Sequence, residues 1–182
     1  MAQIGLKNFY YALMTQEETA TTAATYGTMK RVVGINSIDI SPTVNKATLY
    51  GDDIALATAS ALGEISVTID VADLPMEDLA ALLGHQIVNG MLVSKGSDSA
   101  PYCAIAFESE KHNGEIRYMK LLKGKFSESQ ETINTRGDSI EYQIPQITAT
   151  FVSRANDSVW RYMKDTTDTT VATSWYASIE QA

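Results

Sequence analysis

The sequence predicts a mainly β protein, a β-sandwich or barrel-like fold with one short flanking helix and extended loops or arms. The first observation behind this prediction is a period-two alternation of apolar and polar residues. It is clearest in GEISVTIDVAD, residues 63–73, where the alternation runs without a break. Such a segment predicts a strand with one buried and one solvated face. The apolar positions are Ile65, Val67, Ile69 and Val71.

Similar alternation recurs elsewhere in the chain and predicts further strands. These segments are rich in β-branched and aromatic residues and are separated by turn residues, as is typical of a β-rich domain. They are INSIDIS, PYCAIAFES, EIRYMKLL and SIEYQIPQITATFV.

The second observation is a hairpin turn at Asn113–Gly114, the favoured central pair of a two-residue loop. Pairing outward from this turn sets Glu110 opposite Arg117. It also predicts that one face carries an apolar set from both strands. The set is Cys103, Ile105, Phe107, Ile116, Tyr118 and Leu122.

The third observation is a single helical segment at about residues 75–84, within ADLPMEDLAALLGH. Asp73 or Leu74 stands at the predicted cap, Pro75 suits the first turn, and Gly84 can end the helix. A leucine stripe predicts the buried face, and Met76 is expected to join it. The stripe is Leu79, Leu82 and Leu83.

Length and composition predict one soluble domain spanning residues 1–182. The 45% apolar and 20% charged fractions are ordinary for a globular protein. Two Thr-rich stretches lack periodicity, so we expect a flexible loop at 15–28 and a C-terminal arm at about 165–182. We also expect no membrane span and no signal peptide, because the N-terminal residues lack a basic-then-apolar order.

The charge balance argues against a conventional nucleic-acid binder. Acidic residues number 22 against 14 basic ones, for a net charge of −8, and such a surface repels phosphate backbones. The single cysteine, Cys103, cannot form an internal disulfide and fits the apolar face of its strand. His85 and His112 have no partner at ligand spacing. We therefore expect no catalytic, cofactor or metal site.

Two short motifs invite a functional interpretation. Tyr50-Gly51-Asp52-Asp53 resembles the metal-binding hairpin of template-dependent polymerases, and Arg136-Gly137-Asp138-Ser139 resembles an integrin-binding turn. Polymerase chemistry needs a further carboxylate and a basic triphosphate site, and adhesion needs secretion. Gly-Asp turns beside strands explain both motifs, and we favour that interpretation.

The stretch from Lys111 to Lys125 is locally basic and leaves two interpretations open. Its lysines can protect a solvated edge strand from pairing with other chains. Alternatively, they form a basic flank that meets an acidic flank of another subunit.

Several segments, taken in order, resemble the major tail protein, or tail tube protein, of long-tailed bacteriophages and prophages of Gram-positive hosts. The resemblance covers nearly the whole chain and is most specific from Ala61 to His85. The segments are IGLKNFYYALM, ISPTVNKATLYGDD, ALGEISVTIDVADLPMEDLAALLGH, APYCAIAFES with the following NG turn and RYMKLLKGKF, and TRGDSIEYQIPQITATF.

This resemblance implies a structural virion protein without enzymatic activity or cofactors, made in the host cytoplasm. It implies six-fold rings that stack into a hollow tube around a tape-measure protein, joined to tail tip and terminator proteins. The lumen conducts DNA without binding it, and no membrane is involved. Six copies would carry a formal charge of 6 × −8 = −48, and acidic side chains facing the lumen would repel DNA within roughly 8 Å.

Two sets of candidate residues follow from this picture. The polar faces of the alternating strands supply candidate lumen-facing residues: Glu64, Asp70, Glu128, Gln130, Glu141 and Gln143. An ordinary outer solvent face is the alternative for each of them. The basic flank, the loop after Tyr50 and the aromatic tail supply candidate subunit or ring interface residues: Asp52, Asp53, Lys120, Lys123, Lys125, Trp175 and Tyr176. We expect the segment YGDDIALATASALG to be an extended loop or hairpin that orders against a neighbouring subunit.

Two alternatives of different class remain open. One is another tail component, such as a terminator or a tube-like protein of a contractile or secretion apparatus. The other is a β-sandwich binding module that acts through the RGDS turn, which predicts a stable monomer.

Overall fold

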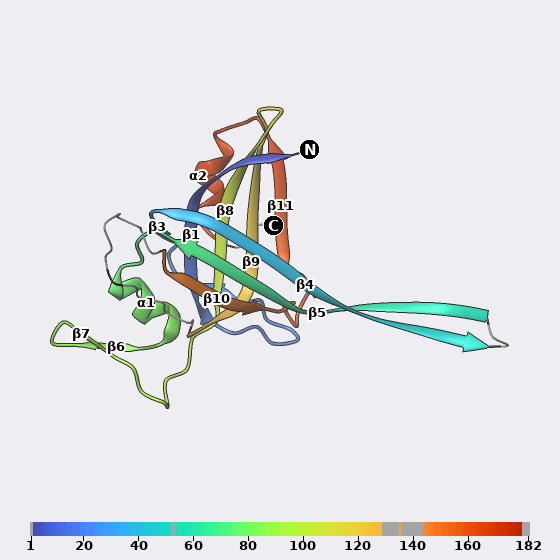
Figure 1. Cartoon of the computed structure of the whole chain (residues 1–182), viewed down its shortest axis with the longest axis horizontal. Helices are drawn as coiled ribbons and strands as arrows, with labels where there is room; N and C mark the ends of the chain where they lie inside the picture. Colours follow the sequence, from blue (N-terminus) through green and yellow to red (C-terminus); the bar gives the residue numbers. More distant parts are fainter. Residues whose placement is uncertain (1, 52–53, 129–134, 136–143, 180–182) are drawn as a thin grey trace.

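Antiparallel strands make up most of the computed structural model, which describes residues 2–51, 54–128, 135 and 144–179 (Figure 1). The strands are β1 Gln3–Gln16, β2 Thr25–Tyr26, β3 Lys30–Val32, β4 Ile35–Gly51, β5 Ile54–Val71, β6 Gln86–Val88, β7 Met91–Val93, β8 Cys103–Lys111, β9 Ile116–Ser127, β10 Gln146–Phe151 and β11 Arg161–Thr166. The helices are α1 Met76–Leu83 and α2 Val171–Trp175. The predicted mainly β fold is confirmed. The five-residue helix α2 lies in a stretch that was predicted to be an arm.

Within the described residues, nine strands form one large sheet in the order β2-β1-β8-β9-β10-β5-β4, with β11 beside β9 and β3 beside β1. The strands β6 and β7 form a separate two-stranded hairpin. In Figure 1, β4 and β5 cross in front of β1, β8 and β9, so the sheet curls over on itself. The main core lies between these two groups of strands.

The predicted inward face of residues 63–73 is confirmed. Ile65, Val67, Ile69 and Val71 are each at most 1% exposed, and they belong to the same buried cluster as Phe107. Burying a side chain of this size contributes about 1.5–3 kcal/mol. Alternation along β5 therefore fixes which face of the sheet is covered.

Helix α1 matches the predicted boundaries closely. Pro75 occupies the N-cap position, one residue after Leu74 and two after Asp73, the two expected caps, and Gly84 ends the helix with a φ of 76°. Leu82 and Leu83 are buried, while Leu79 packs partly buried against the core. The expectation for Met76 was wrong, because its side chain is 49% exposed.

Asp78, in the first turn of α1, is a buried acidic residue. The Tyr11 hydroxyl donates a 2.6 Å hydrogen bond to Asp78 Oδ1, and Lys30 Nζ lies 2.6 Å from the same oxygen. Burial and this hydrogen bond raise the pKa of Tyr11. These contacts join the helix to β1 and β3.

The β8–β9 hairpin forms where it was predicted, but with a different loop and register. Lys111 N–H donates to the Glu115 carbonyl and Gly114 N–H to the Lys111 carbonyl, which makes a three-residue loop with Gly114 at a φ of 81°. This is the turn-plus-bulge loop, in which only the glycine needs positive φ. The extra loop residue shifts the pairing by one.

As a result, Ser109 lies opposite Arg117, and Glu110 lies opposite Ile116. The predicted common face was therefore wrong for β9. Met119 and Leu121 join Cys103, Ile105 and Phe107 in the main core, in place of the set expected from β9. A one-residue slip moves every side chain to the other face, so Leu122 packs in a second, smaller cluster.

The close approach of β9 to β10 generates a test of this packing. A Cβ atom at Gly124 would lie 2.6 Å from the ring of Phe151, which is fully buried. We expect Gly124→Ala to lower the free energy of unfolding by about 1–3 kcal/mol, because the ring must move within a filled core. Urea unfolding measures this loss. The control is Gly96→Ala, where a Cβ meets nothing within 4 Å; equal midpoints for the two variants would contradict the packing.

Candidate assembly surfaces

The outer part of the β4–β5 ladder forms a projecting hairpin, here called the arm, made of residues 44–51 and 54–62. Its pairing runs from Val44–Leu62 to Gly51–Ile54, and no third described strand joins it. Figure 1 shows the arm extending well away from the rest of the chain, on the side opposite β6 and β7. The described residues of the segment YGDDIALATASALG, 50–51 and 54–63, therefore lie in a hairpin, as expected. Asp52 and Asp53 lie outside the described residues.

Large apolar side chains on the arm face solvent. Leu49, Tyr50 and Ile54 are 64%, 69% and 65% exposed. Lys46 is the only charged residue among the arm residues that the structure describes. A surface with so little charge loses little hydration free energy when another chain covers it.

A polar face covers the outer side of the sheet where β4, β5 and β10 lie side by side. Its residues are directly paired across the three strands: Ser37, Asp39 and Ser41 on β4, Ser66, Thr68 and Asp70 on β5, and Gln146, Thr148 and Thr150 on β10. Asp70 accepts a 2.6 Å hydrogen bond from the Ser37 hydroxyl and a 2.9 Å bond from the Gln146 amide. Both bonds lower the pKa of Asp70, so its carboxylate stays charged at neutral pH.

The other candidate lumen residues lie near this face or outside the description. Glu64 is exposed on β5, one residue before the inward Ile65. Glu128 follows the end of β9 and bonds to His85. Gln130, Glu141 and Gln143 lie outside the described residues, as do the four residues of the RGDS motif.

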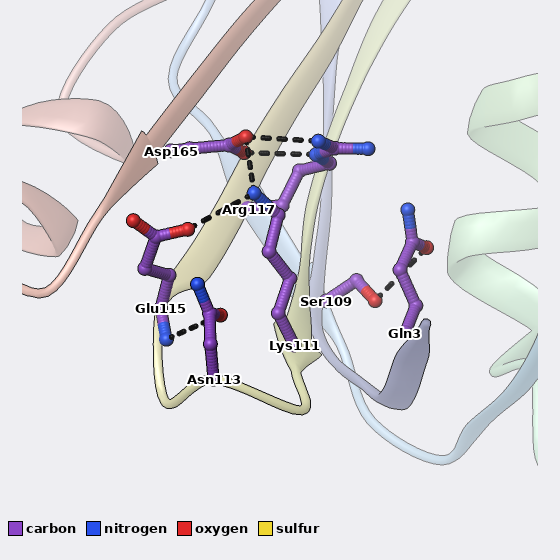
Figure 2. Close-up of polar contacts among 7 residues, drawn as sticks. All are labelled: Gln3, Ser109, Lys111, Asn113, Glu115, Arg117 and Asp165. Carbon is purple, nitrogen blue, oxygen red and sulfur yellow. Dashed lines mark hydrogen bonds and ion pairs between the residues drawn. The ribbon is translucent and has the colours of Figure 1, made fainter. Parts of the chain in front are cut away.

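The basic stretch from Lys111 is tied into an ion-pair network at one end of the sheet (Figure 2). Arg117 Nε and one terminal nitrogen donate to the two Asp165 oxygens at 2.8 Å, and Lys111 Nζ donates to Asp165 and, at 3.2 Å, to Glu115. Lys111 is only 6% exposed. The bonds from Arg117 and Lys111 hold the pKa of Asp165 well below its usual range. The network joins the β8–β9 hairpin to β11, where Asp165 is paired directly opposite Arg117.

Two further hydrogen bonds lie beside this network. Figure 2 shows that the Ser109 hydroxyl donates to the Gln3 amide oxygen at 3.1 Å, which ties β8 to β1. The Asn113 side chain accepts a 3.2 Å bond from the Glu115 N–H within the hairpin loop. The network therefore links β1, β8, β9 and β11 near the β8–β9 turn.

The three candidate interface lysines make contacts within their own chain. Lys123 Nζ lies 2.7 Å from the buried Glu18, and Lys125 Nζ lies 4.3 Å from the centre of the Tyr102 ring. Lys120 is fully buried; it donates to the Ser178 carbonyl at 2.8 Å and lies over the Trp175 ring. Burial lowers the pKa of Lys120 to about 8.

The aromatic tail packs on its own chain, over the face of β1, β8 and β9 that lies opposite the main core. Trp175 is 3% exposed and packs against Tyr118. Tyr176 stacks on Tyr10, with ring centres 4.3 Å apart, and its hydroxyl donates to Glu108 at 3.2 Å. These contacts tie the last described residues to the centre of the sheet.

No described group of three or more histidine, cysteine or acidic side chains could hold a metal ion. Cys103 is fully buried, and burial raises the pKa of its thiol, so it stays neutral. This agrees with the packing role expected from its strand. In the described part of the chain, no helix has the length and apolar character needed to cross a membrane.

The sequence reasoning missed Asp165 and Glu18. Each pairs with a lysine or arginine at least 48 residues away, so no local pattern could connect them. The sequence did carry a signal for docking of the C-terminal segment, because Trp175 and Tyr176 are costly to leave in water.

A mainly β body with a projecting arm of exposed apolar side chains is typical of a structural protein that contacts other chains. Comparison with protein families identifies the chain more narrowly. The family described as phage tail tube protein matches residues 1–169 of the 182. The chain therefore belongs to the phage tail tube protein family, whose members are structural components of the virion tail. The comparison with curated proteins found no significant match.

Family membership implies self-assembly into a tube together with other tail proteins. The match confirms the resemblance to phage tail tube proteins noted in the sequence, while the Gram-positive host stays a prediction. Trp175 and Tyr176 lie beyond the matched residues.

The ion-pair network predicts a pH-dependent contribution to stability. Because the folded state lowers the pKa of Asp165, its contribution is present above the unfolded value of 3.8 and is lost as the pH falls through the folded value. We expect Asp165→Asn to lower the urea midpoint at about pH 7, with the difference from wild type shrinking below about pH 4. The exposed Asp39→Asn serves as the control; a pH-independent difference for Asp165→Asn would contradict the assignment.

Substitution of Lys120 is expected to change stability in the opposite direction from substitution of Asp165. Among the described residues, no carboxylate pairs with the buried Lys120 ammonium, which donates only to a backbone carbonyl. Such a buried charge costs more than an apolar side chain of similar size, so we expect Lys120→Met to raise the free energy of unfolding at about pH 7 by about 1 kcal/mol. The pKa of about 8 in the folded state means that wild-type stability rises relative to the variant between pH 8 and the model value of 10.5. Urea unfolding across this range measures it, with the exposed Lys46→Met as control. A loss of stability at neutral pH would show that the ammonium is better solvated than its burial implies.

Proposed function

We propose that this protein is the major tail tube subunit, which forms six-membered rings that stack into a hollow conduit for DNA ejection. The family match supports a tail tube role, and the exposed apolar arm is the observation that carries the assembly mechanism. The arm has two strand edges without a described partner, and such edges invite pairing with a further chain. A second copy of this chain is the partner that family membership favours.

In this proposal the arm reaches a neighbouring subunit and becomes ordered against it. Leu49, Tyr50 and Ile54 supply the apolar contact area. Asp52 and Asp53, which lie outside the described residues, remain candidate interface residues from the sequence. Apolar contact gives affinity, and alternating side chains on paired strands set the register. The exposed Ile87 and Met91 of the β6–β7 hairpin are a second candidate contact with a neighbouring copy.

The polar face of β4, β5 and β10 is our candidate for the tube lumen. Hydroxyl and amide side chains predominate on it, and the acidic side chains of Glu64, Asp70 and Asp39 carry its charge. Glu128, Gln130, Glu141 and Gln143 extend the candidate set. Carboxylates that stay ionised repel DNA phosphates at short range and so keep the wall non-adhesive.

The contacts that the candidate lysines make within their own chain limit which of them can contact a neighbouring subunit. Lys123 and Lys125 can reach a neighbour only with part of their side chains, because Glu18 and Tyr102 already contact them. Lys120 and Trp175 act from beneath the surface by holding the C-terminal segment in place. Tape-measure, tip and terminator proteins complete the proposed set of partners.

Charged substitutions on the arm test this function. We expect the double variant Leu49→Asp and Ile54→Asp to keep the wild-type urea midpoint, because both side chains are largely exposed. It should fail to form the rings or tubes that concentrated wild-type protein forms in negative-stain images, since two desolvated charges oppose the contact.

The matched control is Val33→Asp, a 70% exposed apolar site outside the arm, which should still assemble. Proteolysis gives a second measurement, with residues 44–62 cut less readily in tubes than in free subunits. Tubes formed by the double variant, or equal cleavage in both states, would contradict the role of the arm.

A further inference from the structure

His85 lies between two carboxylates, one at each ring nitrogen. Nδ1 is 2.9 Å from Asp98 Oδ2, and Nε2 is 2.6 Å from Glu128 Oε1. An ionised carboxylate only accepts hydrogen bonds, so two such bonds require a proton on both nitrogens. The geometry is therefore that of an imidazolium ion, whose side chain is only 7% exposed.

The three residues come from three different places in the fold. His85 follows the αL residue Gly84 at the end of α1 and directly precedes β6. Asp98 closes a turn just after β7, where its Oδ2 accepts the Lys95 N–H at 2.8 Å and its own N–H donates to the Lys95 carbonyl. Glu128 follows the end of β9. The contacts thus close the base of the β6–β7 hairpin and fasten it to the main sheet.

The hairpin above this base carries no charge of its own between residues 86 and 94. Its side chains Ile87, Val88 and Met91 are 41%, 46% and 62% exposed. Among the described elements, β6 pairs only with β7, so no strand of the main sheet holds the hairpin by backbone pairing. The polar cluster at the base is therefore placed to hold this exposed apolar hairpin against the body.

We propose that His85, Asp98 and Glu128 form a proton-dependent clasp that holds the β6–β7 hairpin in place on the subunit. The clasp is closed while His85 is protonated and both carboxylates are ionised. Loss of the imidazolium proton removes one of the two hydrogen bonds, because a neutral ring has a single N–H. His85 then keeps only one of its two carboxylate contacts as a hydrogen bond.

The surroundings of His85 set the direction of this response. Among the described residues, the charged groups that face it are Asp98 and Lys95 from the turn and Glu128 just after β9, with Leu83, Ala100 and Phe126 as apolar neighbours. The hydrogen bond to Asp98, followed by that to Glu128, raises the pKa of His85. The Lys95 N–H and His85 lower the pKa of Asp98. Stability from the histidine is thus present below its unfolded pKa of about 6.5 and is lost as the pH rises through the folded value.

A close backbone contact gives the hairpin base a second, pH-independent anchor. A Cβ atom at Gly84 would collide with the Ser99 carbonyl, so the chain after the turn lies directly against the end of α1. Opening of the clasp is therefore local, and it does not require α1 to unfold. Under the proposed function, it would change the orientation of a candidate contact with a neighbouring copy; the clasp itself stands without that function.

Nuclear magnetic resonance of the free subunit, labelled at its histidine ring nitrogens, tests the protonation state. At about pH 6.5 we expect both ring nitrogens of His85 to carry protons, and we expect its pKa to fall in Asp98→Asn and in Glu128→Gln. The resonances are assigned with His85→Asn. A neutral single tautomer at that pH, or a pKa unchanged in both variants, would overturn the proposal.

Amide hydrogen exchange tests the consequence for the hairpin. We expect the amides of β6, β7 and Lys95 to exchange about fivefold faster in His85→Asn than in wild type at about pH 6, as expected for the loss of about one hydrogen bond. The ratio should fall toward one as the pH is raised above the folded pKa of His85 measured by the resonance titration, where the wild-type clasp has lost its imidazolium proton as well. The matched control, His112→Asn, should leave the ratio near one throughout. A ratio that does not change with pH would overturn the clasp, and because the subunits are unassembled, neither result bears on tube formation.

Discussion

Antiparallel pairing between β4 and β5 is the interaction on which the rest of the structure depends. At its inner end the ladder places Ile65, Val67 and Ile69 in the core and the Ser, Thr and Asp side chains on the opposite face. At its outer end the same ladder continues past the body and forms the arm. A single pair of strands therefore supplies a wall of the core, the candidate lumen face and the candidate assembly contact.

This arrangement couples folding of the subunit to its assembly. A two-stranded ribbon in water is marginally stable by itself, because its faces and outer edges are left without partners. The arm is held by continuity with the core strands rather than by contacts of its own. A neighbouring chain would bury the apolar side chains of the arm and pair its strand edges. The free energy of that burial and pairing is not gained when the subunit folds alone, and it would stabilise the tube instead.

Several charged residues in the described part of the chain form ion pairs within the subunit. Asp165 gathers Lys111 and Arg117, Glu18 binds Lys123, and Asp78 binds Lys30. Basic residues are thereby held close to acidic partners, while the sequence as a whole keeps a net charge of −8. A subunit with this excess of carboxylates would suit the proposed conduit, whose wall must not bind DNA. His85 is a different case, since its charge depends on pH near neutrality and it holds two acidic groups at once.

The sequence alone determined the mainly β class, the inward face of residues 65–71, helix α1, the site of the β8–β9 turn and the tail tube resemblance. These follow from local rules: alternation fixes a strand's faces, Pro75 and Gly84 bound a helix, and Asn-Gly marks a turn. Tertiary structure decided the β9 register, because a one-residue difference in loop type cannot be read from composition. It also decided the pairing of Asp165 with Arg117, the enclosure of Lys120 beneath Trp175, the exposure of Met76 and the meeting of His85 with Glu128. Each of these depends on residues distant in the chain being brought together by packing, and no short-range pattern records which distant partner arrives.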